Sequence, residues 1–235
     1  MAVVDELLSH IFENKQHALY PDFAGWVRGS RRFKAFAIVY RDKIRSKLRN
    51  APDEHGIQDV RAELETAVLL LREERFTLEY EHYAATKQRG PDFTITFKTH
   101  TTFNIEVRRI RDTEVDTDDE NTRIGKLMAV VCDKVGQMPP AIVNALWLAA
   151  ERALPEPVLL HATIGLRQLA ESKNEAFFTK RGFASAYAFL KQYQHLSGIV
   201  VKHETQPAFW ENPIARHAIP TDIKNVLHHL VTATG

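Results

Sequence analysis

The chain has few of the features that would tie it to an oxidising compartment or to a membrane. Only one of its 235 residues is a cysteine, so no disulfide can form within the chain, which suits the reducing cytoplasm. Cys132 lies in an apolar stretch of helical periodicity, which indicates a small core residue rather than a nucleophile. The N-terminal residues lack the apolar region of a signal peptide, and no apolar run is long enough to span a bilayer. We therefore expect a cytoplasmic protein with no membrane partner.

An excess of charge of one sign is also missing. The chain has 31 lysines and arginines against 30 aspartates and glutamates. The net charge of +1 argues against a uniformly basic surface that binds nucleic acid. Any such binding would have to come from local patches. The 11 histidines do not have the Cys/His spacing of a structural zinc site, and no nucleophile-elbow pattern marks a serine hydrolase.

The most regular pattern in the chain is a strict alternation of apolar and polar residues in three consecutive segments. This alternation predicts strands with one buried face. The segments are Phe76–Tyr83, Asp92–Phe97 and Phe103–Ile110. A helix capped by Asp53 should precede them at Ile57–Glu74, and another should follow at Thr122–Gln137. The apolar run Ile142–Ala149 then predicts a buried strand parallel to the third, because a crossover helix joins them.

The remaining periodic stretches predict further helices and one short strand. The helices are expected at residues 3–19, Arg28–Arg49, Val158–Ala170, Ser185–Leu196 and after Pro220, and the strand at Ile199–Lys202. The fold class is therefore α/β, with a central mixed sheet of about five strands flanked by helices. We expect an N-terminal helical extension with a basic patch over residues 1–52 and an α/β domain over residues 53–235, together one compact unit.

The polar faces of the second and third strands carry the residues that could bind a metal ion or take part in a reaction. Asp92 opens the second strand, and Glu106 and Arg108 lie two apart on the third, so both leave on one face. Two carboxylates on neighbouring strands with a cation beside them suit Mg²⁺ or Mn²⁺, and Mg²⁺ fills its octahedron with water and phosphate oxygens. The alternative is that Asp92 belongs to a turn and that Glu106 and Arg108 form a solvated strand face.

Pro91-Asp92 at a strand start, followed by Glu106-Val107-Arg108 on the next strand, resembles the PD-(D/E)XK nuclease superfamily over roughly residues 57 to 150. The resemblance implies a restriction-endonuclease-like fold that hydrolyses phosphodiester bonds, in DNA rather than RNA. It also implies that Asp92 and Glu106 bind the metal. A glutamate of the preceding helix often joins them, and Glu63 and Glu65 are both candidates. Many relatives of this fold act as dimers, which implies a homodimer.

Arg108 departs from the pattern, which has a lysine at this position. Arginine cannot deprotonate, although its planar fork can still clamp a phosphate. Lys126 follows the third strand and is a candidate to stand in for the missing lysine. The alternative is a catalytically lapsed nuclease fold that acts as a nucleic-acid-binding or protein-interaction module. A further alternative is that the motif is accidental.

The stretch Arg28–Arg49 is the most basic in the chain, and its apolar residues recur at helical spacing. We expect a helix that packs on the body and shows its charge outward, either as a solvated face or as a patch that holds a phosphate backbone. The residues expected to contact nucleic acid are Arg31, Arg32, Lys43, Lys47, Lys87 and Arg89. The acidic run after Arg111 should form an exposed loop near the mouth of the site.

Overall fold

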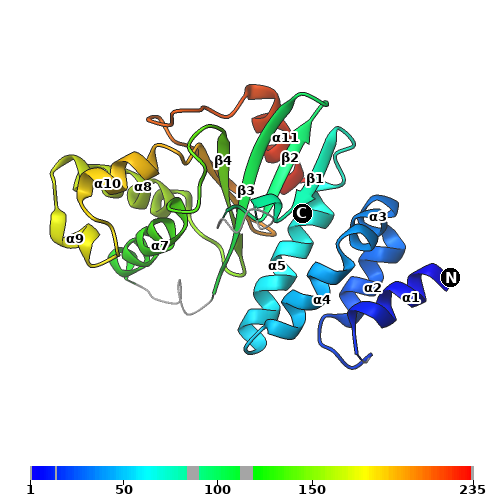
Figure 1. Ribbon diagram of the computed structural model, residues 1–235. Coiled ribbons are helices and arrows are strands. Elements are labelled where there is room, and N and C mark those ends of the chain that lie inside the picture. Colours follow the sequence, from blue (N-terminus) through cyan, green and yellow to red (C-terminus); the bar gives the residue numbers. More distant parts are fainter. Residues whose placement is uncertain (1, 14, 84–89, 112–118, 234–235) are drawn as a thin grey trace.

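The computed structural model describes residues 2–13, 15–83, 90–111 and 119–233. These residues form an α/β protein in which a mixed sheet lies between helices on both faces (Figure 1). The sheet has six strands in chain order: β1 (Phe76–Tyr80), β2 (Phe93–Phe97), β3 (Thr101–Ile110), β4 (Val143–Ala150), β5 (Gly198–Lys202) and β6 (Ala208–Glu211). Strands β3, β4 and β5 are parallel, and the other neighbours pair antiparallel.

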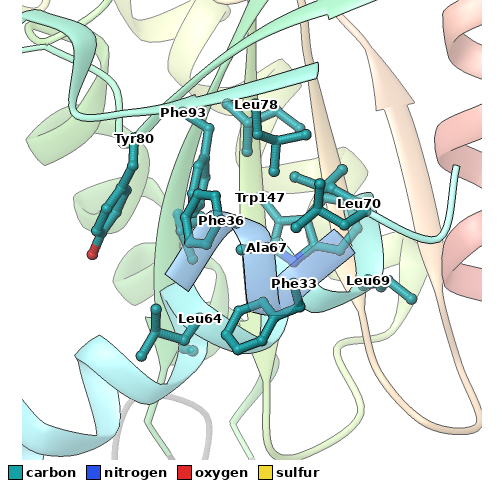
Figure 2. Close-up of a cluster of buried hydrophobic side chains, with 14 of the residues drawn as sticks. Phe33, Phe36, Leu64, Ala67, Leu69, Leu70, Leu78, Tyr80, Phe93 and Trp147 are labelled. Atoms are coloured by element: carbon teal, nitrogen blue, oxygen red, sulfur yellow. The ribbon is translucent and has the colours of Figure 1, made fainter. Parts of the chain in front are cut away.

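Helices from both ends of the chain lie on one side of the sheet and share one hydrophobic core with it (Figure 1). They are α1 (Ala2–Ile11), α2 (Tyr20–Gly29), α3 (Arg31–Val39), α4 (Arg41–Asn50), α5 (Glu54–Leu70) and α11 (Thr221–Thr232). Figure 2 shows part of their shared core, in which Phe33 and Phe36 of α3 pack with Leu64 of α5 and Phe93 of β2. The N-terminal helices therefore belong to the same hydrophobic core as the sheet.

The opposite face of the sheet is covered by helices from the middle of the chain. They are α7 (Glu120–Val135), α8 (Glu156–Glu171), α9 (Glu175–Thr179) and α10 (Ala186–Tyr193). Their core includes Leu146 and Leu148 of β4 with Cys132 of α7. Burial raises the pKa of the Cys132 thiol to about 12, which fits the predicted core residue rather than a nucleophile. No helix in the described ranges is both long and apolar enough to cross a bilayer.

The α/β class and the mixed sheet expected from the sequence are confirmed. Strand β4 pairs parallel with β3, from Phe103 opposite Val143 to Ile110 opposite Ala150, as the crossover predicted. Asp53 caps α5, because its side chain accepts a hydrogen bond from the backbone of Gly56 at 2.8 Å. The sheet has one strand more than the five expected, since β6 lies in a segment for which no strand was expected.

The N-terminal helices begin and end at different residues from those expected. Helix α1 ends at Ile11, well before the end of the helix expected over residues 3–19. Pro21 lies in the first turn of α2, where a backbone N–H would have no partner within the helix. The single helix expected over Arg28–Arg49 is wrong. Ser30 ends α2 and caps α3, because its hydroxyl accepts from the backbone of Phe33 at 3.1 Å, and Tyr40 separates α3 from α4.

Candidate metal centre

The pairing of β2 with β3 brings Asp92 to Glu106. Phe93 lies opposite Ile105, so the register continued by one residue sets Asp92 opposite Glu106. The carboxylate of Asp92 accepts a hydrogen bond from the backbone N–H of Val107 at 2.8 Å, which holds it against β3. The two carboxylates that were predicted to share an ion therefore lie together at one end of these strands.

Of the two candidate glutamates on α5, the structure places Glu63 at this site. The carboxylate of Glu63 accepts from the hydroxyl of Tyr80 and from Nζ of Lys47, both at 2.5 Å. The side chain of Glu65 is 46% exposed and pairs instead with Arg61, whose Nε lies 2.9 Å from its carboxylate. Two residues further along a helix is about 200° around its axis, which takes Glu65 away from Asp92.

Two lysines reach these carboxylates from the two helical layers. Lys47 of α4 also lies 2.8 Å from the carboxylate of Glu81 and 3.8 Å from that of Asp92. Lys134, near the end of α7, donates a hydrogen bond to Glu106. The sequence had suggested Lys126 as the lysine near the site, and Tyr80 only as a buried strand residue. The structure brings Lys134 to Glu106 and the Tyr80 hydroxyl to Glu63.

Arg108 lies two residues after Glu106 on the same face of β3 and is half-buried. Its guanidinium donates to the backbone carbonyl of Arg109 at 2.5 Å. A cavity of about 530 Å³ opens beside these groups. It is lined by Asp59, Glu63, Asp92, Val107, Arg108, Arg109, Arg111, Asp133, Lys134 and Gln137. A cavity of this size is within the range of small-molecule sites and leaves room for a phosphate group.

The carboxylates of the site repel one another. Burial and the charge of Asp92 raise the pKa of Glu106 to about 8, although Lys134 opposes the change. Burial and the same charge raise the pKa of Glu63 to about 7, with Lys47 and Tyr80 opposing. Burial lowers the pKa of Lys47, but the charges of Glu63 and Asp92 outweigh burial and leave it above its ordinary value. A cation that enters the site would relieve this repulsion.

The donor set fits a hard divalent cation. Asp92 and Glu106 supply carboxylate oxygens, and one or two carboxylates are what Mg²⁺ commonly takes from a protein. In the part of the chain that the structure describes, no group of three or more His, Cys, Asp or Glu side chains could hold a metal ion. An ion here would therefore depend on two carboxylates, with water and substrate oxygens as its other ligands.

The basic residues expected to contact nucleic acid lie in three different settings. Arg31 is exposed at the start of α3. Arg32 donates to the backbone carbonyls of Leu71 at 2.7 Å and of Glu73 at 2.5 Å, and also to that of Phe76. The first two carbonyls belong to the turn between α5 and β1, and the third belongs to the first residue of β1.

Lys43 donates to the carbonyls of Tyr80 at 2.9 Å and Glu81 at 3.2 Å, and Lys47 is held by the carboxylates of the site. The outward charge expected of the basic stretch is therefore wrong for Arg32, Lys43 and Lys47, which turn toward the sheet. Lys87 and Arg89, and most of the acidic run after Arg111, lie outside the described residues.

Comparison with protein-family models, curated proteins and solved structures finds no significant match for this chain.

Proposed function

We propose that the protein is a Mg²⁺-dependent phosphodiesterase that hydrolyses DNA, with a restriction-endonuclease-like fold and with Asp92 and Glu106 as the metal ligands. The observation that carries the proposal is the meeting of these two carboxylates on adjacent strands, with Glu63 of α5 near enough for the charge of Asp92 to raise its pKa. The resemblance of Pro91-Asp92 and Glu106-Val107-Arg108 to the PD-(D/E)XK pattern supports the same chemistry.

The chain's own residues would bind and orient the substrate. A bound Mg²⁺ or Mn²⁺ supplies an activated water and stabilises the negative charge that develops on phosphate. Arg108 lines the cavity, and its planar fork suits two phosphate oxygens. Lys134 lies beside Glu106, and it would supply the compact cation that Arg108 replaces in the strand motif. Together, these two cations would hold the scissile phosphate against the carboxylates.

A cleavage assay with the Asp92→Ala variant tests the proposal. We expect the wild-type protein to cut single-stranded or double-stranded DNA in millimolar MgCl₂ and to lose this activity in EDTA. The variant should be inactive while its circular dichroism spectrum and melting temperature show a folded protein. Glu171→Ala is the control, because Glu171 is exposed on α8, pairs with Arg167 and lines neither the cavity beside Asp92 nor the carboxyl ends of the parallel strands. Cleavage by Asp92→Ala at the wild-type rate would remove the proposal.

The neutralisation of the carboxylates by lysine favours a second candidate function. Lys47 and Lys134 already pair with Glu63 and Glu106, so the site is partly compensated without a metal. With Arg108 in place of the motif lysine, the fold would then serve as a catalytically lapsed module that binds nucleic acid or a protein. Isothermal titration calorimetry with Mg²⁺ and Mn²⁺ separates the two, because only the nuclease requires binding at millimolar concentration.

We further propose a cytoplasmic location and a homodimeric assembly. The lone cysteine, buried in α7, supports the first, and the resemblance to the nuclease superfamily supports the second. Analytical ultracentrifugation over a range of protein concentrations tests the dimer, and a monomer at every concentration would remove it.

A further inference from the structure

A second hollow lies at the carboxyl ends of the parallel strands. Two adjoining cavities, of about 350 and 700 Å³, share the lining residues Ala62, Glu65, Ala149, Lys202 and Glu204. Ala149 and Lys202 stand at the ends of β4 and β5, and α5 forms the facing wall. In open α/β sheets, ligands bind preferentially at the carboxyl ends of the strands. We call the smaller cavity the carboxyl-end cavity.

Trp147 of β4 places an unused hydrogen-bond donor at the carboxyl-end cavity. The side chain is only 1% exposed, yet it lines this cavity with Thr66 and Leu69 of α5. Figure 2 shows Trp147 in the core that α5 covers. No described residue accepts a hydrogen bond from its indole N–H, and this nitrogen is not among the fully buried polar atoms that lack a partner, so it keeps some access from the cavity. Because a buried tryptophan N–H usually finds a partner, this donor is available to an acceptor that enters the cavity.

The other walls of the carboxyl-end cavity are aromatic and of mixed charge. Trp26 of α2 is half-buried, with its ring 5.9 Å from that of Phe33 at an interplanar angle of 84°. Lys202 and Glu204 stand at the rim and form no ion pair with any described residue. The charged lining residues are Arg72, Lys202, Glu65 and Glu204, so their formal charges cancel.

This combination is suited to a nucleobase. A planar heteroaromatic ring can stack on Trp26, and a ring acceptor can receive the Trp147 N–H. The donors and acceptors on the edge of a base can then meet Glu204 and Lys202. A strongly anionic ligand fits less well, because the charge of the lining is balanced. We infer that the carboxyl-end cavity binds a nucleobase, carried either by a free nucleoside or by a bound single strand.

The inference does not rest on the candidate metal centre. The carboxyl-end cavity shares no lining residue with the cavity beside Asp92. Arg109 stands between the larger adjoining cavity and the metal centre, because it lines both. It is 7% exposed and is fixed by Asp59 at 2.8 Å and Glu151 at 2.6 Å.

Nuclear magnetic resonance of the tryptophan indoles tests the inference. The chain has three tryptophans, and each gives one indole ¹H–¹⁵N signal. We expect the Trp147 signal, identified by its loss in Trp147→Phe, to shift saturably with adenosine, guanosine, cytidine or thymidine at millimolar concentration. A short single-stranded oligothymidylate is titrated in parallel, and comparison of its midpoint with that of thymidine distinguishes a strand from a free nucleoside.

Three variants sharpen the test, with affinity followed by the backbone amide signals of the cavity. Trp147→Phe keeps the ring but removes the donor, and should weaken binding about three- to tenfold. Trp26→Leu removes the stacking surface and should weaken binding by about tenfold or more. Trp210→Phe is the matched control, because Trp210 lies on β6 and lines a different cavity. It should bind as the wild type does.

Absence of any shift at Trp147 with all four nucleosides and the oligonucleotide would overturn the inference. Unchanged affinity in both Trp147→Phe and Trp26→Leu would overturn it as well. Asp92→Asn should keep wild-type nucleoside affinity, since Asp92 does not line this cavity. Intact nucleoside binding in a protein that never cleaves DNA would therefore remove the proposed nuclease function and leave this inference standing.

Discussion

Replacing Glu106 by glutamine tests the electrostatics of the candidate metal centre through protein stability. Burial and the charge of Asp92 raise the pKa of Glu106 from 4.5 to about 8. The folded protein therefore keeps a proton that the unfolded chain releases above about pH 4.5, so the free energy of unfolding falls as pH rises toward 8. At one pKa unit per 1.36 kcal/mol, Glu106 alone lowers it by at most about 5 kcal/mol above pH 8.

Glutamine copies the shape of the protonated glutamate and cannot ionise. We expect Glu106→Gln and the wild type to differ little in unfolding free energy near pH 5, where Glu106 is protonated in the fold. Above pH 8 the variant should be the more stable, by up to several kcal/mol. Glu63 contributes a fall of the same sign in both proteins, because its pKa is raised to about 7.

Urea denaturation followed by circular dichroism at a series of pH values measures this difference. Glu65→Gln is the control, and its stability should follow the wild-type pH dependence, because Glu65 is half-exposed and outside the site. Curves for Glu106→Gln and wild type that run parallel from pH 5 to above 8 would refute the reasoning. A variant that is less stable than the wild type at high pH would refute it equally.

Three further predictions concern metal affinity, the lysine beside Glu106 and the inward-facing arginine. Mg²⁺ affinity measured by calorimetry should rise with pH through about 7 to 8, because Glu63 and Glu106 must lose protons, and a flat profile would contradict this. Lys134→Met should slow DNA cleavage by about a hundredfold, whereas Lys126→Met should not, and equal effects would contradict the assignment of Lys134. Arg32→Met should lower the free energy of unfolding by about 2–3 kcal/mol in urea titrations, because it leaves carbonyls near β1 without a charged donor. Arg31→Met should leave stability unchanged.

The strands of the candidate site were predictable because their periodicity is complete. In β1, buried Phe76, Leu78 and Tyr80 alternate with exposed residues, and this alternation is visible in the sequence alone. The positions of Asp92 and Glu106 then follow from the hairpin register. The strand β6 was missed because it has only four residues, too few to display a period, and lies at the edge of the sheet.

The lysine beside Glu106 was not found because its position depends on helix geometry. Helix α7 returns along β3 in the opposite direction, as a crossover helix must. Which lysine of α7 faces Glu106 depends on where the helix begins relative to the end of β3 and on its rotation about its own axis, and neither can be read from the sequence. Lys126 lies in the first half of α7, whereas Lys134 lies far enough along it to reach Glu106.

The inward orientation of Arg32, Lys43 and Lys47 could not be read from periodicity. An apolar stripe shows which side of a helix packs on the body, but long basic side chains at its border can lie along the apolar surface and reach beyond it. Here Arg32 reaches a carbonyl just before β1, and Lys43 reaches the carbonyl of the last residue of β1. Lys47 reaches the carboxylate of Glu63. The partners come from distant segments, so only the tertiary structure identifies them.

Anomalous diffraction from crystals soaked in millimolar MnCl₂ tests the central claim most directly. We expect a manganese peak bound by the carboxylates of Asp92 and Glu106, with Lys134 moved from Glu106 to make room. A map without a peak at this position, in which Lys134 still donates to Glu106, would contradict the assignment of a metal centre to this end of β2 and β3.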